Sequence, residues 1–274
     1  MNPLYRDVKA SGIRLRVTEV GTGTPLLLLH GLFFDRSSWY QTQTHLAQDF
    51  RVIAPDLPGF GESEKPSSAR FGYTVEAYVQ AILDLFAGLR LGQACIAGHG
   101  LGGAIALSLA SSNPELVSRL VLVDSLCYPT RPDRARRVAS LPLLGGTLFK
   151  QLWGRALFTN YFRNVLLGPR AQVPSERITH YYETFNTPSG RNSALEVLRA
   201  TLDARTVEVK LSQVGVPTLV LWGRHDALYP AAFGQRLAKE IRGAGFRLLD
   251  TGHTPLEEAP LELAENIRRF CRPS

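Results

Sequence analysis

The stretch Ala97-Gly98-His99-Gly100-Leu101-Gly102-Gly103 decides the fold of this chain. It closes a short apolar run that begins at Gln93, and it opens a run of small and apolar residues that ends at Ser112. A strand that turns sharply into a helix at glycines is typical of a nucleophile elbow, G-x-S-x-G, whose central residue projects its side chain at the edge of a sheet. Here the central residue is Gly100, which has no side chain. The stretch therefore predicts the geometry of a catalytic turn without the atom that attacks the substrate.

Further short runs predict the other strands. The segment from Gly12 to Gly21 alternates apolar and polar residues, which is typical of a half-exposed strand. The other runs are mostly continuous and apolar, as expected for strands buried on both faces of a parallel sheet. Because helical patterns separate them, they predict an α/β fold, with strands expected at residues 12–21, 25–30, 51–55, 93–97, 120–124, 217–222 and 245–249.

The pattern changes between Leu126 and about Gln213. Short helical pieces, separated by prolines and glycines, replace the alternation of strand and helix. A block of short helices inserted between two strands is expected to form a lid. We therefore predict an α/β core domain of residues 1–125 and 214–274 and a helical cap of residues 126–213.

Composition and cysteine usage indicate the class of protein. The 274 residues are 45% hydrophobic, which is enough for a large core. The first twelve residues lack the apolar core of a signal peptide, and no run approaches the roughly 18 apolar residues of a membrane span. Cys95, Cys127 and Cys271 are far apart, which argues against a disulfide framework and a cysteine metal cluster. We expect a cytoplasmic protein with free thiols in a reducing compartment and no transmembrane segment.

The net charge of +7 is concentrated in one segment. Between Leu126 and Arg170 a single acidic residue, Asp133, stands against eight basic ones: Arg131, Arg134, Arg136, Arg137, Lys150, Arg155, Arg163 and Arg170. No nucleic-acid recognition motif accompanies them, so nucleic acid is not an expected partner. A solvated helix face is the simplest interpretation, and the alternatives are a basic lip that attracts an anionic substrate and a surface that rests on a membrane.

Five motifs in order along the chain carry a resemblance to a known family. They are His30-Gly31-Leu32, Asp56-Leu57-Pro58-Gly59-Phe60-Gly61-Glu62-Ser63, Gly98-His99-Gly100-Leu101-Gly102-Gly103, Gly223-Arg224-His225-Asp226-Ala227-Leu228-Tyr229-Pro230 and Gly252-His253-Thr254-Pro255-Leu256-Glu257. Together they make the chain resemble the α/β-hydrolase superfamily along nearly its whole length, and most closely its capped esterases, carbon–carbon bond hydrolases and epoxide hydrolases. The resemblance implies a mostly parallel central sheet flanked by helices, with a helical cap inserted after the sixth strand.

The resemblance also implies a catalytic site. Asp226 and His253 match the acid and the base in the family's order, where a buried carboxylate fixes the tautomer of the imidazole and stabilises its charged form. The implied oxyanion hole consists of the backbone amides of Leu32 and Leu101, the second of which starts a helix. Asp124 ends a strand and is a fallback acid, although a structural role is the simpler interpretation.

The substrate is expected to be a small apolar molecule, with an anionic group as a further option. Its pocket is expected between lid and sheet, lined by His30, Gly31, His99, Cys127, Trp153, Phe158 and Phe162. His99 and His225 are also interpreted as packing residues. The sequence contains no metal-ligand spacing, dinucleotide fingerprint or phosphate-binding loop, so we expect no cofactor and no metal.

The missing nucleophile leaves three hypotheses for the function. Gly100 is neither the Ser of esterases nor the Asp of epoxide hydrolases, and loss of a triad nucleophile typically costs about 10⁶ in rate. Cys127 follows a strand end, but a lone Cys in an apolar setting is usually inert. The first hypothesis is an enzyme that uses Asp226 and His253 as a general base for a non-covalent lyase, cyclase, carbon–carbon cleavage or water-activated hydrolysis reaction.

The second hypothesis is a serine ester or carbon–carbon hydrolase inactivated by an engineered change of serine to Gly100. The third is a ligand-binding protein without activity on a hydrolase fold, and it gives no reason to keep both Asp226 and His253. A separate structural account of the glycine is also open. The elbow residue is held in a strained backbone conformation that costs a residue with a β-carbon about 1 to 3 kcal/mol, and glycine relieves this strain.

Overall fold

An eight-stranded sheet forms the centre of the computed structural model, which describes residues 2–129, 141, 151, 153–201, 204–208 and 210–272. The strands lie in the order β1-β2-β4-β3-β5-β6-β7-β8. The pairs β1/β2 and β2/β4 are antiparallel, and all other neighbours are parallel. The strands are β1 (Leu4–Ala10), β2 (Ile13–Val20), β3 (Thr24–Leu29), β4 (Phe50–Pro55), β5 (Ala94–His99), β6 (Val117–Val123), β7 (Thr218–Gly223) and β8 (Gly245–Leu249). The predicted mostly parallel α/β sheet is confirmed.

Burial explains which strands the sequence reveals. Every residue of β5 and of β7 is buried, as a continuous apolar run requires of a strand covered on both faces. By contrast, most side chains of β1 are exposed, so this edge strand has no apolar pattern and was not predicted. It is held by its register with β2, in which Val8 pairs with Leu15.

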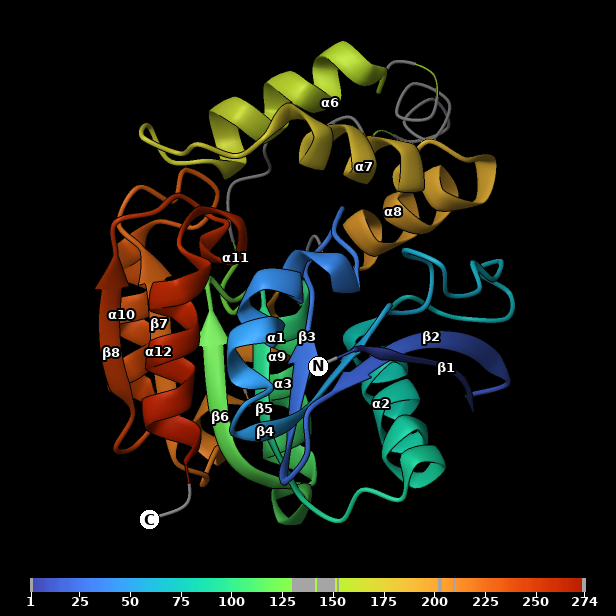
Figure 1. Ribbon diagram of the computed structural model, residues 1–274. Helices are drawn as coiled ribbons and strands as arrows, with labels where there is room; N and C mark the ends of the chain where they lie inside the picture. Colours follow the sequence, from blue (N-terminus) through green and yellow to red (C-terminus); the bar gives the residue numbers. More distant parts are fainter. Residues whose placement is uncertain are drawn as a thin grey trace.

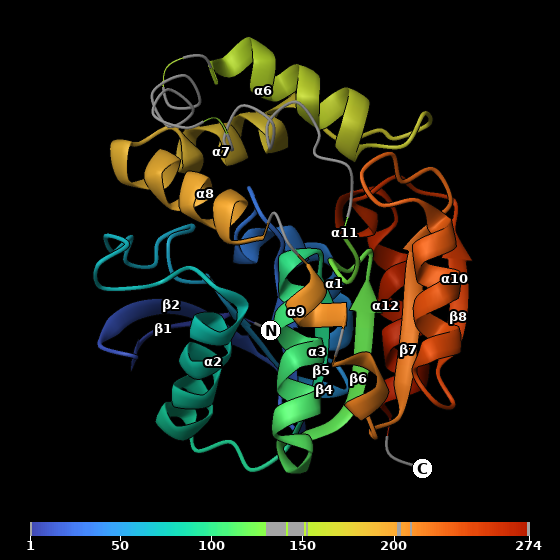
Figure 2. The ribbon, with the colours of Figure 1, turned by 180° about the vertical axis from the view of Figure 1, so that it is seen from behind.

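Helices cover both faces of the sheet (Figures 1 and 2). On one face α1 (Tyr40–Leu46) and α12 (Pro260–Cys271) pack against the sheet, and on the other α2 (Val75–Leu89), α3 (Leu101–Ser112) and α10 (Ala231–Glu240) do so. The predicted flanking helices are therefore present. Shorter helical turns are η1 (Arg36–Trp39), η2 (Pro114–Leu116), α9 (Arg205–Glu208), η4 (Leu211–Gln213) and α11 (Pro255–Glu258).

Helices between β6 and β7 lie beyond the end of the sheet toward which β6 points (Figure 1). These are α6 (Arg155–Tyr161), the π-helical turn η3 (Phe162–Leu166), α7 (Ser175–Phe185) and α8 (Pro188–Ala200). Their aromatic side chains form a cluster of their own, which also takes in Phe33 and Phe34 from the segment after β3. The helical insertion thus follows the sixth strand, while the division into two domains at residues 125/126 and 213/214 stays a prediction.

Two cysteines contradict the expectation of free thiols. Cys95 in β5 and Cys271 at the end of α12 form a disulfide bond, and Cys127 is free and buried. The prediction was wrong because 176 residues separate the pair, whereas both side chains belong to the apolar cluster between the sheet and α12. The disulfide also removes the reason for inferring a reducing compartment.

Other expectations concern membrane and charge. Among the described residues no helix is long and apolar enough to cross a membrane. Of the eight predicted basic-segment residues, Arg131, Arg134, Arg136, Arg137 and Lys150 lie outside the residues that the structure describes. Arg155 and Arg170 are exposed and pair with Glu183 and Asp250.

Polar contacts tie α7 to the segments on either side of the site. His180 Nε2 lies 2.8 Å from Asp35 Oδ2, and Arg177 Nη2 lies 2.6 Å from Glu257 Oε1. Arg177 also donates to the carbonyl oxygen of Ser37 at 2.9 Å. Asp35 lies in the segment after β3, and Glu257 lies four residues after His253, so α7 contacts the segments on both sides of the site.

The contact between His180 and Asp35 makes stability depend on pH. The hydrogen bond that His180 donates to the carboxylate of Asp35 raises the pKa of His180 above its ordinary 6.5. The stabilisation from this contact is therefore fully present below about pH 6.5 and is lost as the pH rises through the raised value. We expect His180→Gln to flatten the fall in thermal stability between pH 6 and 8.5, by less than about 1 kcal/mol because the imidazole is half exposed. His225→Gln, which removes an exposed contact with Asp250, is the matched control. An unchanged pH profile in His180→Gln would contradict this account.

Candidate functional site

The elbow is a turn in which close packing requires glycine at positions 98 and 102. β5 ends at His99, Gly100 has φ +53° and ψ −113°, and α3 begins at Leu101. A Cβ atom at Gly98 would collide with the carbonyl oxygen of Gly102, and one at Gly102 would collide with the carbonyl oxygen of Leu29. Only glycine therefore lets α3 approach the sheet this closely.

Gly100 differs from the other two glycines because space is open in front of it. A Cβ atom added there would lie 3.6 Å from His253 Nε2 and 3.7 Å from the Cα atom of Gly31, which are ordinary contact distances. A side chain at position 100 would thus fit and would point at the imidazole. Crowding does not require glycine here, although the positive φ favours it.

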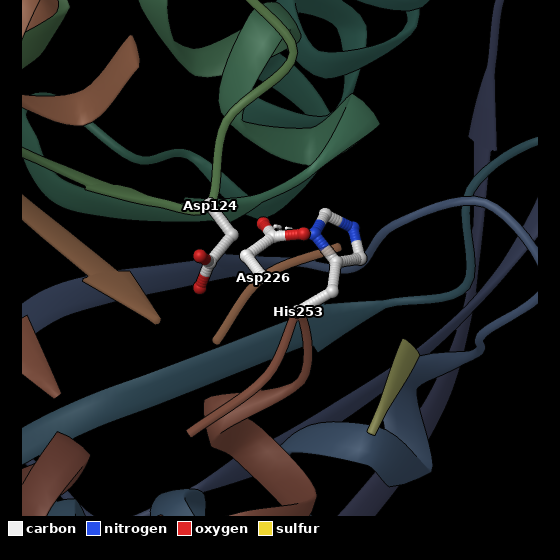
Figure 3. Close-up of side chains that lie close together, drawn as sticks. All are labelled: Asp124, Asp226 and His253. Carbon is white, nitrogen blue, oxygen red and sulfur yellow. Dashed lines mark hydrogen bonds and ion pairs between the residues drawn. The ribbon is translucent and has the colours of Figure 1, made fainter. Parts of the chain in front are cut away.

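Asp226 and His253 form the buried pair that the sequence predicts (Figure 3). His253 Nδ1 lies 2.8 Å from Asp226 Oδ2, and their exposed fractions are 4% and 7%. The other oxygen, Oδ1, accepts the amides of Leu228 at 2.7 Å and Tyr229 at 2.8 Å. With a proton on Nδ1 donated to the carboxylate, Nε2 keeps its lone pair. The pair can therefore act as a base toward anything in front of Gly100.

The backbone around His253 is fixed by three further contacts. Its amide donates to the carbonyl oxygen of Leu166 at 2.7 Å, and its carbonyl oxygen accepts from His99 Nε2 at 2.7 Å. Burial holds the pKa of His99 well below its usual value, so this ring is neutral and Nε2 carries the proton. Glu258 accepts the amide of Gly252 at 3.0 Å. These contacts position the imidazole from the elbow, from η3 and from α11.

Asp124 lies beside the pair as a second buried carboxyl (Figure 3). Its Oδ1 accepts the amide of Gly223 at 2.8 Å. Burial, and next the charge of Asp226, raise the pKa of Asp124 well above its usual value, which favours the uncharged form of this carboxyl. Ligand atoms of Asp124, Asp226 and His253 lie within 4.8 Å of one another, but a metal ion there would have to displace the proton shared by Asp226 and His253. A structural role for Asp124 fits best.

A cavity of about 30 Å³ lies between Gly100 and His253. It has room for about two water molecules. Leu32 and Leu101 both line it, and among the described residues neither amide donates a hydrogen bond. The lining also includes Phe33, Leu126, Tyr161, Leu166, Val197, Leu198, Thr201, Leu228 and Tyr229.

The remaining predicted pocket residues are not among the described residues that line the cavity. His30 Nε2 accepts the amide of Leu57 at 2.9 Å, and burial lowers the pKa of His30 to about 4, so it is a neutral residue that joins two loops. Cys127 is buried, and burial raises the pKa of its thiol well above the usual value, which makes it inert. Trp153 stacks on Phe33. The described lining of the cavity does not include Gly31, His99, Phe158 or Phe162.

The lining residues that sequence reasoning missed come from two sources. Leu228 and Tyr229 belong to the motif that carries Asp226, where their amides bind its carboxylate. Their positions, two and three residues after Asp226, were the sequence signal that could have placed them at the site. By contrast, Val197 and Thr201 lie at the end of α8 and just after it, in a region where no motif marks the residues that face the sheet.

Comparison with known proteins places this geometry among relatives. The sequence model described as "Alpha/beta hydrolase family" matches residues 26–266. A 2-hydroxymuconate semialdehyde hydrolase from Pseudomonas sp. (strain CF600) is 30% identical over 93% of this chain and 89% of its own length. A soluble epoxide hydrolase from Corynebacterium sp. (strain C12) is 26% identical over 98% of this chain and 97% of its own. An esterase from Exiguobacterium antarcticum, 19% identical, shares the fold with a TM-score of 0.84 over 98% of this chain and 100% of its own.

Because the space at Gly100 is open, a substitution there tests backbone strain without crowding of a side chain. We expect Gly100→Ala to lower the free energy of unfolding by about 1 to 3 kcal/mol, since alanine fits the space but must adopt a positive φ. Gly92→Ala, at a position with no atom within 4 Å and no positive φ, is the control and should be neutral or stabilising. Chemical denaturation measures both, and equal midpoints for Gly100→Ala and the wild type would show that the elbow carries no strain.

Proposed function

Because this chain belongs to the α/β-hydrolase family, we propose that it is an enzyme that uses Asp226 and His253 as a general base without a covalent intermediate. The observation that carries the proposal is the buried hydrogen bond of 2.8 Å between the two side chains, with Nε2 directed at the open space over Gly100. A protein without activity would gain nothing from directing a buried base at an empty space, because polar groups are costly to bury.

The chemistry follows from the groups around the cavity. Nε2 of His253 takes a proton from the carbon next to a carbonyl group, or from a water molecule, and Asp226 stabilises the imidazolium that forms. In the first case the electron pair of the broken bond moves to the carbonyl oxygen, whose negative charge the amides of Leu32 and Leu101 stabilise. Proton abstraction, elimination and cyclisation begin with this step, whereas hydrolytic carbon–carbon cleavage begins when the activated water attacks the carbonyl carbon.

The lining supports an apolar carbonyl compound as the substrate. Among the described lining residues none is Lys or Arg, so the cavity favours a neutral reacting end over an anionic one. We propose that residues 126–213 act as the cap, because η3 and α8 supply Leu166, Val197 and Leu198 to the lining. Exclusion of water by these side chains strengthens the interactions of a developing oxyanion.

Proton exchange tests the proposal without knowledge of the natural substrate. We expect the protein to exchange the protons next to the carbonyl of 2-butanone for deuterium in D₂O, as followed by the loss of the ¹H NMR signals. His253→Ala should abolish the exchange, and Asp226→Asn should slow it by about 10³ to 10⁴, because the wrong tautomer then faces the substrate.

The controls for this experiment are the solvent rate and a neighbouring imidazole. His225→Gln removes an exposed histidine adjacent to Asp226, and this variant should exchange the ketone protons at the wild-type rate. Exchange that survives in His253→Ala would rule out the proposed base. Exchange at the solvent rate in the wild type would rule out proton abstraction from ketones by this site.

A second candidate function is that of a serine hydrolase whose nucleophile is missing. The distance of 3.6 Å from an added Cβ atom to His253 Nε2 favours it, because a serine hydroxyl at position 100 would reach hydrogen-bond distance of the base. We expect Gly100→Ser to release p-nitrophenolate from p-nitrophenyl acetate in a burst of one equivalent. The double variant Gly100→Ser/His253→Ala should show no burst, and an inert Gly100→Ser would contradict this candidate.

A further inference from the structure

The cavity beside His253 is too small to hold an organic substrate. Its volume is about 30 Å³, whereas pockets that bind small molecules commonly measure about 300 to 1,000 Å³. The atoms of a substrate that do not react must therefore lie in a neighbouring space, and the residues shared between the cavity and that space form the partition between them.

A second cavity of about 190 Å³ shares two walls with the first. Leu126 and Thr201 line both cavities. Phe33 lines both the first cavity and a third one, but the third cavity measures only about 10 Å³. The larger cavity is bounded by the start of α2, the end of α8 and α9, through Thr74, Val75, Glu76, Ala200, Ala204 and Val207.

The partition and the larger cavity suit an uncharged chain. The hydroxyl of Thr201 already donates to the carbonyl oxygen of Val197 at 2.7 Å, so this residue does not offer a free donor to a ligand. Glu76 is the charged residue of the lining, and its Oε1 lies 3.2 Å from Lys210 Nζ, which balances its charge. Among the described residues that line this cavity none is Lys or Arg, so an anionic chain would find no cation in the lining to pair with.

We propose that this second cavity, the chain pocket, binds the unbranched apolar chain of a neutral carbonyl substrate, while the carbonyl end reaches His253 past Leu126 and Thr201. The proposal rests on the proposed function for the identity of the reacting end. In this proposal a rotation of the Leu126 side chain, which lines both cavities, connects them. The chain pocket then selects substrates by length, since each buried methylene adds to the affinity.

A series of methyl ketones from acetone to 2-octanone tests the proposal. Saturation-transfer NMR titrations give the dissociation constants, and exchange in D₂O gives the rates. We expect binding to tighten by up to about fourfold for each added methylene, the value for full burial of a CH₂ group. Ala200→Trp should fill the mouth of the chain pocket and lower the 2-octanone to acetone ratio, for both binding and exchange, at least tenfold. Ala87→Trp, at an exposed position near the end of α2, should leave the ratio unchanged.

A third variant and a charged ligand complete the test. Leu126→Ala should raise the rate of 2-octanone exchange relative to acetone, because the partition is shortened. Binding that does not tighten with chain length, or a ratio that Ala200→Trp leaves unchanged, would overturn the chain pocket. Tighter binding of octanoate than of 2-octanone would overturn its preference for neutral chains. Length-dependent binding that Ala200→Trp removes, without exchange of any ketone, would instead leave the chain pocket standing and contradict the proposed function.

Discussion

The hydrogen bond between His253 Nδ1 and Asp226 Oδ2 is the interaction on which the site depends. The two residues follow different strands, β7 and β8, and the bond brings their loops together at the end of the sheet. It also fixes which nitrogen of the imidazole faces the elbow. Without this bond, either ring nitrogen of His253 could carry the proton. The site would then lack a defined base beside the amides of Leu32 and Leu101.

The buried polar groups around this bond are neutral or satisfied, which limits their cost. His30 and His99 are neutral because burial lowers the pKa of each ring, and both donate or accept defined hydrogen bonds. Burial raises the pKa of Asp124 and so disfavours a negative charge on it. Asp226 is therefore the carboxylate left to stabilise a positive charge on His253, and the site concentrates its charge change on one imidazole.

The sequence revealed those parts of the fold in which burial is two-sided or chemistry forms a motif. The strands β3, β5 and β7 are visible as apolar runs, and Asp226 and His253 stand in motifs at strand ends. The exposed edge strand β1 has no such pattern, and the disulfide between Cys95 and Cys271 joins residues that are remote in sequence. His30 was expected to line the substrate pocket, whereas it accepts the amide of Leu57 and is not among the described residues that line the cavity.

The lining from α8 was beyond sequence reasoning for a related reason. Which face of an inserted helix meets the sheet depends on how the helix packs as a whole, and the contacts of α7 with Asp35, Ser37 and Glu257 contribute to that packing. Val197 and Leu198 are apolar, but so are residues that pack only within the helices. Apolar character alone therefore does not separate lining residues from packing residues.

The tautomer of His253 is the most direct measure of whether the site contains a base without a nucleophile. It can be read from the ¹⁵N NMR shifts of the ring nitrogens in protein labelled at histidine, at a pH where the ring is neutral. The account predicts a proton on Nδ1 and a bare Nε2, and it predicts that Asp226→Asn reverses this assignment. A neutral ring with its proton on Nε2 in the wild type would contradict it.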